Sequence, residues 1–273
     1  MKGSRWRLPL RYMVLLYLAL LVLVPVGAVF FHAFSGGLGA AWNGFTAPDA
    51  LDALLLTLIV VAIAVPLNTI FGVGVSLILA RHRFPGAWLL DALVDIPLAI
   101  SPVVIGLSLI LVYGHTGWWG NWLAARGITV IFSVPGIVMA SAAVSLPYVV
   151  RGVLPVLQEI GTEQEQAART LGAKPFTVFR RITLPSIRRG LAYGVTLTTA
   201  RVLGEFGAVS IVAGAFAGKT QTYTLFISQS IDNLKPQSAY VGAVVLCLAA
   251  LIVLTTLTLT DRNRDAWHGK AAA

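Results

Sequence analysis

The feature that most restricts how this chain can fold is a series of long apolar blocks separated by short polar connections. An apolar stretch of about 20 residues crosses a bilayer as one helix, whereas about 10 to 14 residues are typical of a helix buried in a protein core. Charged residues make up only 11% of the chain, too few to cover the surface of a soluble fold. We therefore expect six membrane spans. They cover about residues 11–34, 52–80, 92–113, 128–150, 188–213 and 239–260.

These spans should be helices. Only helices and closed barrels satisfy all backbone hydrogen bonds in lipid, and the blocks lack the alternation that barrel strands need. The first block, 11–34, follows a basic start and resembles a signal peptide. It is longer than the ~7–15-residue apolar core of such a peptide, and five more blocks follow, so we interpret it as a retained span. The sequence predicts an all-α, polytopic transmembrane bundle that forms a single domain over residues 1–273.

The basic residues in the connections predict the orientation. Sixteen of them belong to one set of connections, which includes both termini, the turn with Arg81 and Arg83, and the segment 151–189. The other set carries only Arg126, Lys219 and Lys235. Connections rich in Lys and Arg remain in the cytoplasm, so we expect both termini there. The same distribution explains the net charge of +9 without nucleic-acid binding.

A short loop that contains three tryptophans falls on the opposite, outer side. The residues are Trp118, Trp119 and Trp122. Tryptophan is enriched where a membrane meets water, because one part of its side chain is apolar and the other polar. We interpret the three as an interfacial belt rather than as a ligand site.

The cytoplasmic segment 151–187 is the one long, charged connection, and it carries signals for a short helix. Thr162 and Glu165 have capping-box spacing, and Glu165 stands four residues before Arg169, as in a helical ion pair. Gly172 can adopt the left-handed conformation that ends a helix. We expect a well-capped helix here, which would carry any contact with a soluble partner.

A second helical stretch should run from Phe176 to Thr183 and stop before Pro185, because the residue before a proline disfavours helix. The first helix gathers a ridge of small and apolar side chains. The ridge consists of Ala167, Ala168 and Leu171. Helical periodicity alone leaves two alternatives open: the ridge could pack on its own bundle, or it could dock in a groove of a partner.

The letters of this segment, AARTLGA followed by ITLP, resemble the coupling motif of ABC-importer permeases. Gln166 stands where that family usually has Glu, with Glu165 beside it. The resemblance implies that the helix docks in a cleft of a nucleotide-binding subunit. The matching positions are Ala167, Ala168, Gly172, Ile182, Leu184 and Pro185. The residues expected to couple to the ATPase are Glu165, Gln166, Ala167, Ala168, Leu171 and Gly172.

The similarity extends over nearly the whole chain, to the W-type permeases of bacterial sulfate and thiosulfate importers. It is carried by YGHTGWWGNWL, VIFSVPGIVMA, LPYVVRGVLPVLQEIGTEQEQAARTLGA, ARVLGEFGAVSIVAG and GKTQT. Molybdate and tungstate permeases share the GEFGA and GKTQT character, so they remain an alternative. An ion-coupled secondary transporter is a weaker one, because no internal repeat is evident and a coupling segment would have no purpose.

The resemblance also implies an assembly in the bacterial inner membrane. Its expected members are a T-type sister permease, giving a heterodimer, two ATP-binding subunits that use ATP and Mg²⁺, and a sulfate-binding protein outside. This chain itself should bind no cofactor and catalyse no reaction.

The sequence carries no signature of catalytic chemistry. Gly218-Lys219-Thr220 imitates the end of a phosphate-binding loop, but that loop also needs a glycine where Ala213 stands. Asp91 and Asp95 share a helix face, and we interpret them as solvated or capping residues rather than as a catalytic pair. The spacing of His, Cys, Asp and Glu gives no metal-binding pattern.

Two ionisable residues lie inside the fifth predicted span. Arg201 and Glu205 are one helical turn apart, with Thr198 nearby. Charges at this depth are costly and often functional. Two interpretations stay open: the residues line a path for an anion, or they form an ion pair that fixes helix packing.

Overall fold

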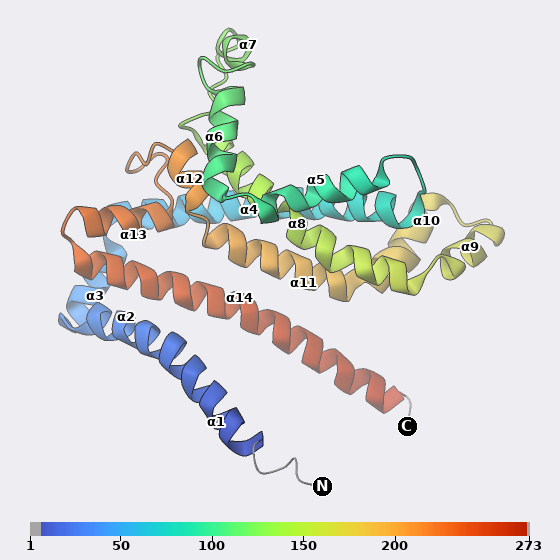
Figure 1. Ribbon diagram of the computed structural model, residues 1–273, viewed down its shortest axis with the longest axis horizontal. Coiled ribbons are helices and arrows are strands. Elements are labelled where there is room, and N and C mark those ends of the chain that lie inside the picture. The colour runs from blue at the N-terminus through green and yellow to red at the C-terminus, as the bar shows by residue number, and fades with distance from the viewer. Residues whose placement is uncertain (1–6, 272–273) are drawn as a thin grey trace.

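The computed structural model describes residues 7–271, with side chains described from residue 11 to residue 255. Every regular element in this part of the chain is a helix, as predicted (Figure 1). The bundle is built on three packed helices, with a fourth lying against them. The three are α4 (Pro48–Arg81), α8 (Val134–Ile160) and α11 (Leu184–Leu203), and the fourth is α14 (Pro236–Ala271).

Four helices in the described residues are long and apolar enough to cross a membrane. They are Arg11–Phe34, Pro48–Arg81, Val134–Ile160 and Pro236–Thr255. The first comprises part of α1 (Arg7–Leu18), the π-helical η1 (Ala19–Leu23) and α2 (Val24–Phe34). Its α2 part packs on α14, and none of the residues in its most apolar window is buried within this chain.

The third predicted span, 92–113, is not one straight helix. It consists of α5 (Ala87–Ala99) and α6 (Pro102–Tyr113), which meet at an angle of 112°. Ile100 and Ser101 are extended between them. Pro102 forces this break, because proline disfavours a helical residue before it and lacks the N–H that would continue the helix. In Figure 1, α6 turns away from the bundle and ends near α7 (Gly120–Ala124).

The fifth predicted span, 188–213, is also interrupted. Helix α11 ends at Leu203, and the six-residue helix α12 (Gly207–Val212) follows after a short break. Three arginines in α11 also leave it less apolar than the four spanning helices. The third and fifth predicted spans are thus each broken into two helices, and the count of six spans stays a prediction. The remaining elements are α3 (Gly37–Thr46), α9 (Glu163–Thr170), α10 (Pro175–Val178), η2 (Phe179–Thr183) and α13 (Tyr223–Asp232).

Glycines allow α8 and α11 to cross at backbone contact. A Cβ atom on Gly152 would lie 2.6 Å from the carbonyl oxygen of Gly190, and one on Gly194 would lie 2.9 Å from the Cα of Val149. Small residues at such crossings are typical of membrane bundles, where packing rather than water exclusion holds helices together. The crossing holds together the two helices that flank the segment 161–183.

Candidate functional site

Helix α9 forms the centre of the segment between α8 and α11. Gly172 ends it with φ of +81°, which confirms the predicted left-handed position. The N–H of Ala173 donates to the carbonyl of Ala168 at 3.0 Å, and that of Gly172 donates to Arg169 at 3.0 Å. These two bonds form a Schellman motif, in which glycine is favoured because it has no Cβ to clash.

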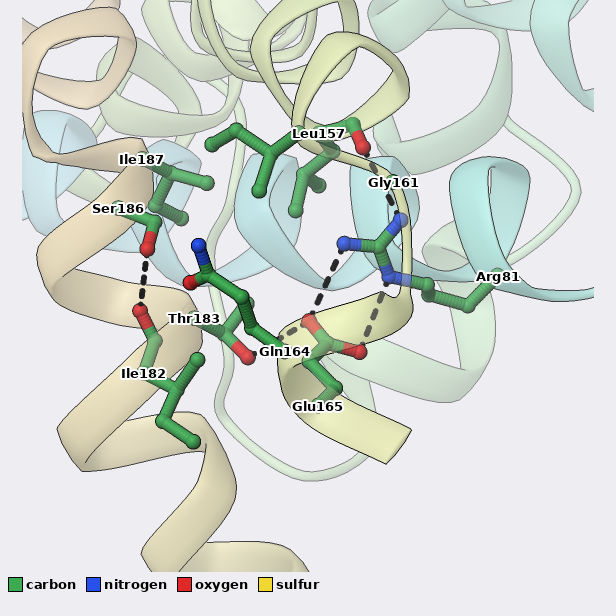
Figure 2. Close-up of a pocket in the computed structure, with 10 residues that line it drawn as sticks. Arg81, Leu157, Gly161, Gln164, Glu165, Ile182, Thr183, Ser186 and Ile187 are labelled. Carbon is green, nitrogen blue, oxygen red and sulfur yellow. Dashed lines mark hydrogen bonds and ion pairs between the residues drawn. The ribbon is translucent and has the colours of Figure 1, made fainter. Parts of the chain in front are cut away.

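The predicted local partners of Glu165, Thr162 and Arg169, were wrong. Its carboxylate neither completes a capping box nor pairs with Arg169; it points into the protein (Figure 2). Arg81 donates to it from Nε at 3.2 Å and from Nη2 at 3.1 Å, and the hydroxyl of Thr183 donates to it at 2.8 Å. Thr162 instead accepts a hydrogen bond from the side chain of Gln166 at 3.0 Å. Glu165 is buried because these long-range partners satisfy both of its oxygens.

Arg81 completes a junction between four elements. It is the last residue of α4, and its Nη1 donates to the carbonyl of Leu157 in the last turns of α8 at 3.0 Å. Glu165 contributes from α9 and Thr183 from η2. We call these four residues the Arg81 junction. Sequence reasoning missed it, because Arg81 was interpreted only as a charge that sets orientation.

Exposed apolar side chains occur on α9, in the turn that follows it and at the start of α10. Leu171 in the turn is 88% exposed, Phe176 in α10 is 71% exposed, and Ala167 in α9 is also exposed. Gln166 is exposed and Ala168 is half-buried. The predicted ridge is therefore accessible at Ala167 and Leu171. We call Ala167, Leu171, Gly172 and Phe176 the coupling face; a contiguous exposed apolar patch outside the membrane is typical of an interaction site.

We predicted from the sequence that the second helical stretch stops before Pro185, and this prediction was wrong. It passes through the π-helical turn η2 and enters α11, in whose first turn Pro185 lies. Proline is tolerated there because its missing N–H is not needed by the first turn. Helix α10 is therefore continuous with α11 through η2, whereas α9 is separated from α10 by the turn at Gly172.

A second polar centre lies at the end of α11. Nη1 of Arg201 and Oε2 of Glu205 are 2.6 Å apart, which confirms that the two residues form a pair. Their geometry is that of an ion pair rather than an aligned hydrogen bond. The Glu205 side chain is 1% exposed and that of Arg201 is 28% exposed. Oε1 of Glu205 also accepts a hydrogen bond from the N–H of Ala208 at 2.9 Å. The carboxylate therefore satisfies a free N–H in the first turn of α12 and also neutralises the charge of Arg201.

One further hydrogen bond belongs to this centre, and a buried hydroxyl precedes it on α11. The backbone carbonyl of Glu205 accepts a hydrogen bond from the hydroxyl of Thr224 at 2.8 Å. Thr198 is fully buried, and its hydroxyl has no hydrogen-bond partner among the described residues. The structure thus places Thr198 in the interior, near the C-terminal end of α11, rather than on an open surface.

Asp91 and Asp95 act differently from the prediction that they are solvated or capping residues. Both carboxylates bind Arg151 of α8: Nη2 is 2.9 Å from Oδ1 of Asp91, and Nε donates to Oδ1 of Asp95 at 2.9 Å. The three side chains are 36–46% exposed. They link α5 to α8, and such partly exposed pairs contribute only about 0–1 kcal/mol to stability.

The sequence Gly218-Lys219-Thr220 forms a tight turn. The backbone N–H groups of Lys219 and Thr220 both donate to the carbonyl of Phe216, at 3.1 and 2.9 Å. These amides are directed inward, whereas a phosphate-binding loop directs its amides toward the ligand.

A family model described as the binding-protein-dependent transport system inner membrane component matches residues 72–261. The chain belongs to this family. Among the relatives of this importer permease, the sulfate transport system permease protein CysW of Synechocystis sp. is 48% identical over 257 residues, covering 94% of this chain and 92% of that protein. CysW of Escherichia coli (strain K12) is 42% identical, covering 86% and 81% of the two chains.

A T-type relative is also similar to this permease. The sulfate transport system permease protein CysT of Escherichia coli (strain K12) is 38% identical, covering 91% of this chain and 90% of that protein. The permease is therefore a W-type member of the sulfate-permease group, as the sequence motifs indicated.

Solved structures confirm the fold. A chain of a bacterial alginate ABC transporter, solved in complex with an alginate pentasaccharide-bound periplasmic protein, superposes with a TM-score of 0.79 at 16% identity. The match covers 94% of each chain. The permease is thus an all-helical, multi-pass membrane subunit of the ABC-importer class.

Proposed function

We propose that this permease forms part of the path through which an ATP-driven importer carries sulfate or thiosulfate into the cell. The W-type and T-type relatives named as sulfate permeases support sulfate over the molybdate alternative. The permease does not change the anion chemically. ATP and Mg²⁺ act in separate ATP-binding subunits, of which the assembly holds two.

Coupling to those subunits takes place through the coupling face. The observation that carries this proposal is the contrast between two parts of this segment: Glu165 of α9 is fixed by the Arg81 junction, whereas Leu171 after α9 and Phe176 of α10 are exposed. Both oxygens of Glu165 are already bonded within the chain, so this residue anchors the helix instead of touching the partner. Gln166, Ala167, Ala168, Leu171 and Gly172 remain as the docking set.

Arg201 lies beside the anion path, with Glu205 and Thr198 behind it. A dianion that loses hydration in a membrane needs its charge offset, and a single arginine at 28% exposure can supply part of that offset. Tight binding would hinder release, so the carboxylate of Glu205 weakens the field of the arginine. The rival interpretation, a purely structural ion pair, is separated from this one by the double variant described in the Discussion.

The complete assembly pairs this permease with a T-type sister, and a sulfate-binding protein docks on the outer side. The termini and α9 face the cytoplasm, while the tryptophan loop faces outward. The distribution of Lys and Arg supports this orientation, and in Figure 1 the end of α14 points toward the end of the molecule that holds α9.

The test uses the complete complex in proteoliposomes, with radiolabelled sulfate uptake and competition by thiosulfate and molybdate. Leu171→Glu should reduce both uptake and co-purification of the ATP-binding subunit by about tenfold, because a central apolar contact contributes more than ~1 kcal/mol to an interface. Leu234→Glu is the matched control, since Leu234 is equally exposed at 88% but lies outside the coupling face. Full uptake and retention of the ATP-binding subunit by Leu171→Glu would refute the docking proposal.

A further inference from the structure

Helix α9 is joined to its neighbours through two glycines. Gly161 precedes it with φ of +70° and Gly172 follows it with φ of +81°. A Cβ atom at either position would meet nothing within 4 Å, so packing around these residues does not hold the helix in place. The backbone at both ends adopts conformations that other residues rarely reach, and these are points about which a short helix can pivot.

The Arg81 junction is the buried polar connection between α9 and the bundle (Figure 2). The side chains of Arg81 and Glu165 are 13% and 10% exposed, so water competes little for their hydrogen bonds. The guanidinium fork binds both carboxylate oxygens, which fixes orientation as well as distance. The third bond of Arg81, to the carbonyl of Leu157, ties the same group to α8.

We propose that Arg81 is a positioning residue that transmits displacement of α9 to α4 and α8 during transport. This inference rests on the proposed function of α9 as the docking helix. A force applied at the coupling face reaches the ends of α4 and α8 through the Arg81 junction. Without the junction, the same force rotates α9 about Gly161 and Gly172, and the spanning helices stay where they are.

The principal variant is Arg81→Gln, which keeps a polar side chain and removes the charged fork. In the complete complex, sulfate uptake should fall about fivefold or more, the lower end of coupling between distant sites. ATP hydrolysis by the same complex should stay within about twofold, because the coupling face remains exposed for docking. The number of ATP molecules hydrolysed per sulfate imported therefore rises. Glu165→Gln should give the same change from the other side of the junction.

Two exposed residues provide matched controls with the same change of charge. Arg83→Gln removes an arginine two residues after Arg81, and Glu159→Gln removes a glutamate from the last turn of α8. Both should keep the wild-type ratio of ATP to sulfate. If Arg81→Gln behaves as Arg83→Gln does, the inference is wrong. It is also wrong if assembly, ATP hydrolysis and uptake all fall together, because the junction would then serve only folding.

A distance measurement tests the mechanical role without transport. Spin labels at Thr170 in α9 and Ile78 in α4, both exposed, report the separation of the two helices once Cys247, the single cysteine, is replaced by serine. In the complete complex, Arg81→Gln should broaden the distance distribution, and Arg83→Gln should leave it narrow. An unchanged distribution in Arg81→Gln would overturn the inference. If the wild-type complex itself imports no sulfate, the proposed function is refuted instead.

Discussion

The pair formed by Arg201 and Glu205 allows the two interpretations of the polar centre to be separated by three variants: Arg201→Gln, Glu205→Gln and the double change. The two side chains differ in their surroundings. Glu205 is almost completely buried, with one backbone N–H as its other partner, whereas Arg201 is 28% exposed. This difference predicts unequal losses of stability from the two single variants.

Arg201→Gln leaves a buried carboxylate with only the N–H of Ala208 to stabilise it. Removing one partner of a buried ion pair costs about 3–5 kcal/mol, and the burial of Glu205 places this variant in that range. Glu205→Gln keeps an acceptor for the Ala208 N–H and leaves an arginine that can reach water. Its cost should be about 1–2 kcal/mol, as for the loss of one hydrogen-bond partner. The double variant leaves no buried charge and should be about as stable as Glu205→Gln.

The assay combines the thermal midpoint and the folded yield of the purified permease with sulfate uptake by the complete complex. If Arg201 lies beside the anion path, the double variant recovers stability but not uptake. If the pair is only structural, the double variant recovers both. A larger loss of stability in Glu205→Gln than in Arg201→Gln would refute the reasoning from burial.

Two further predictions concern packing and orientation. Gly190→Val should lower folded yield and cost about 1–3 kcal/mol or more, because a side chain there meets the backbone of Gly152; Gly74→Val, with nothing within 4 Å, is the control. Equal yields for the two variants would contradict the close crossing of α8 and α11. In cells whose permease lacks Cys247, an impermeant thiol reagent should label a cysteine at Asn121 and not one at Thr170, since the distribution of Lys and Arg predicts that α9 faces the cytoplasm. The reverse labelling pattern would invert the proposed topology.

Local sequence signals predicted α9 well at its C-terminal end and poorly at its N-terminal end. Gly172 adopts the left-handed conformation because that preference belongs to the residue itself. Glu165 has the spacing for two local interactions and makes neither. A partially exposed helical ion pair contributes only about 0.5 kcal/mol, so a buried guanidinium and a buried hydroxyl easily outcompete it.

The same distinction applies to the spans. The apolar blocks identified the membrane-spanning helices, but not the turn at Ser101 or the break at Gly204. Pro102 and Glu205 lie close to these two breaks, but neither residue by itself predicts that a span is interrupted there. A proline can interrupt a span, as Pro102 does, or lie within continuous helix, as Pro185 does after η2. The outcome depends on whether neighbouring groups satisfy the backbone carbonyls that the proline leaves without a donor.

The basic residues Lys2 and Arg5, which contribute to the predicted orientation, lie outside the described residues. Arg151 belonged to the same charge count, and the structure gives it a second role as the partner of Asp91 and Asp95. The distribution of charge along a sequence therefore predicts a topology without showing which charges also pair within the bundle.

The sequence by itself determined that this chain is a helical membrane protein of the importer-permease family. Insertion of a helix depends on about 20 consecutive residues, and the family resemblance is carried by short runs of neighbouring residues, so both can be recognised from local sequence. The tertiary structure alone decided that Arg81 binds Glu165, 84 residues further along the chain. That contact exists because α4, α8 and η2 end where α9 begins, and burial there excludes the water that would otherwise compete for both charges.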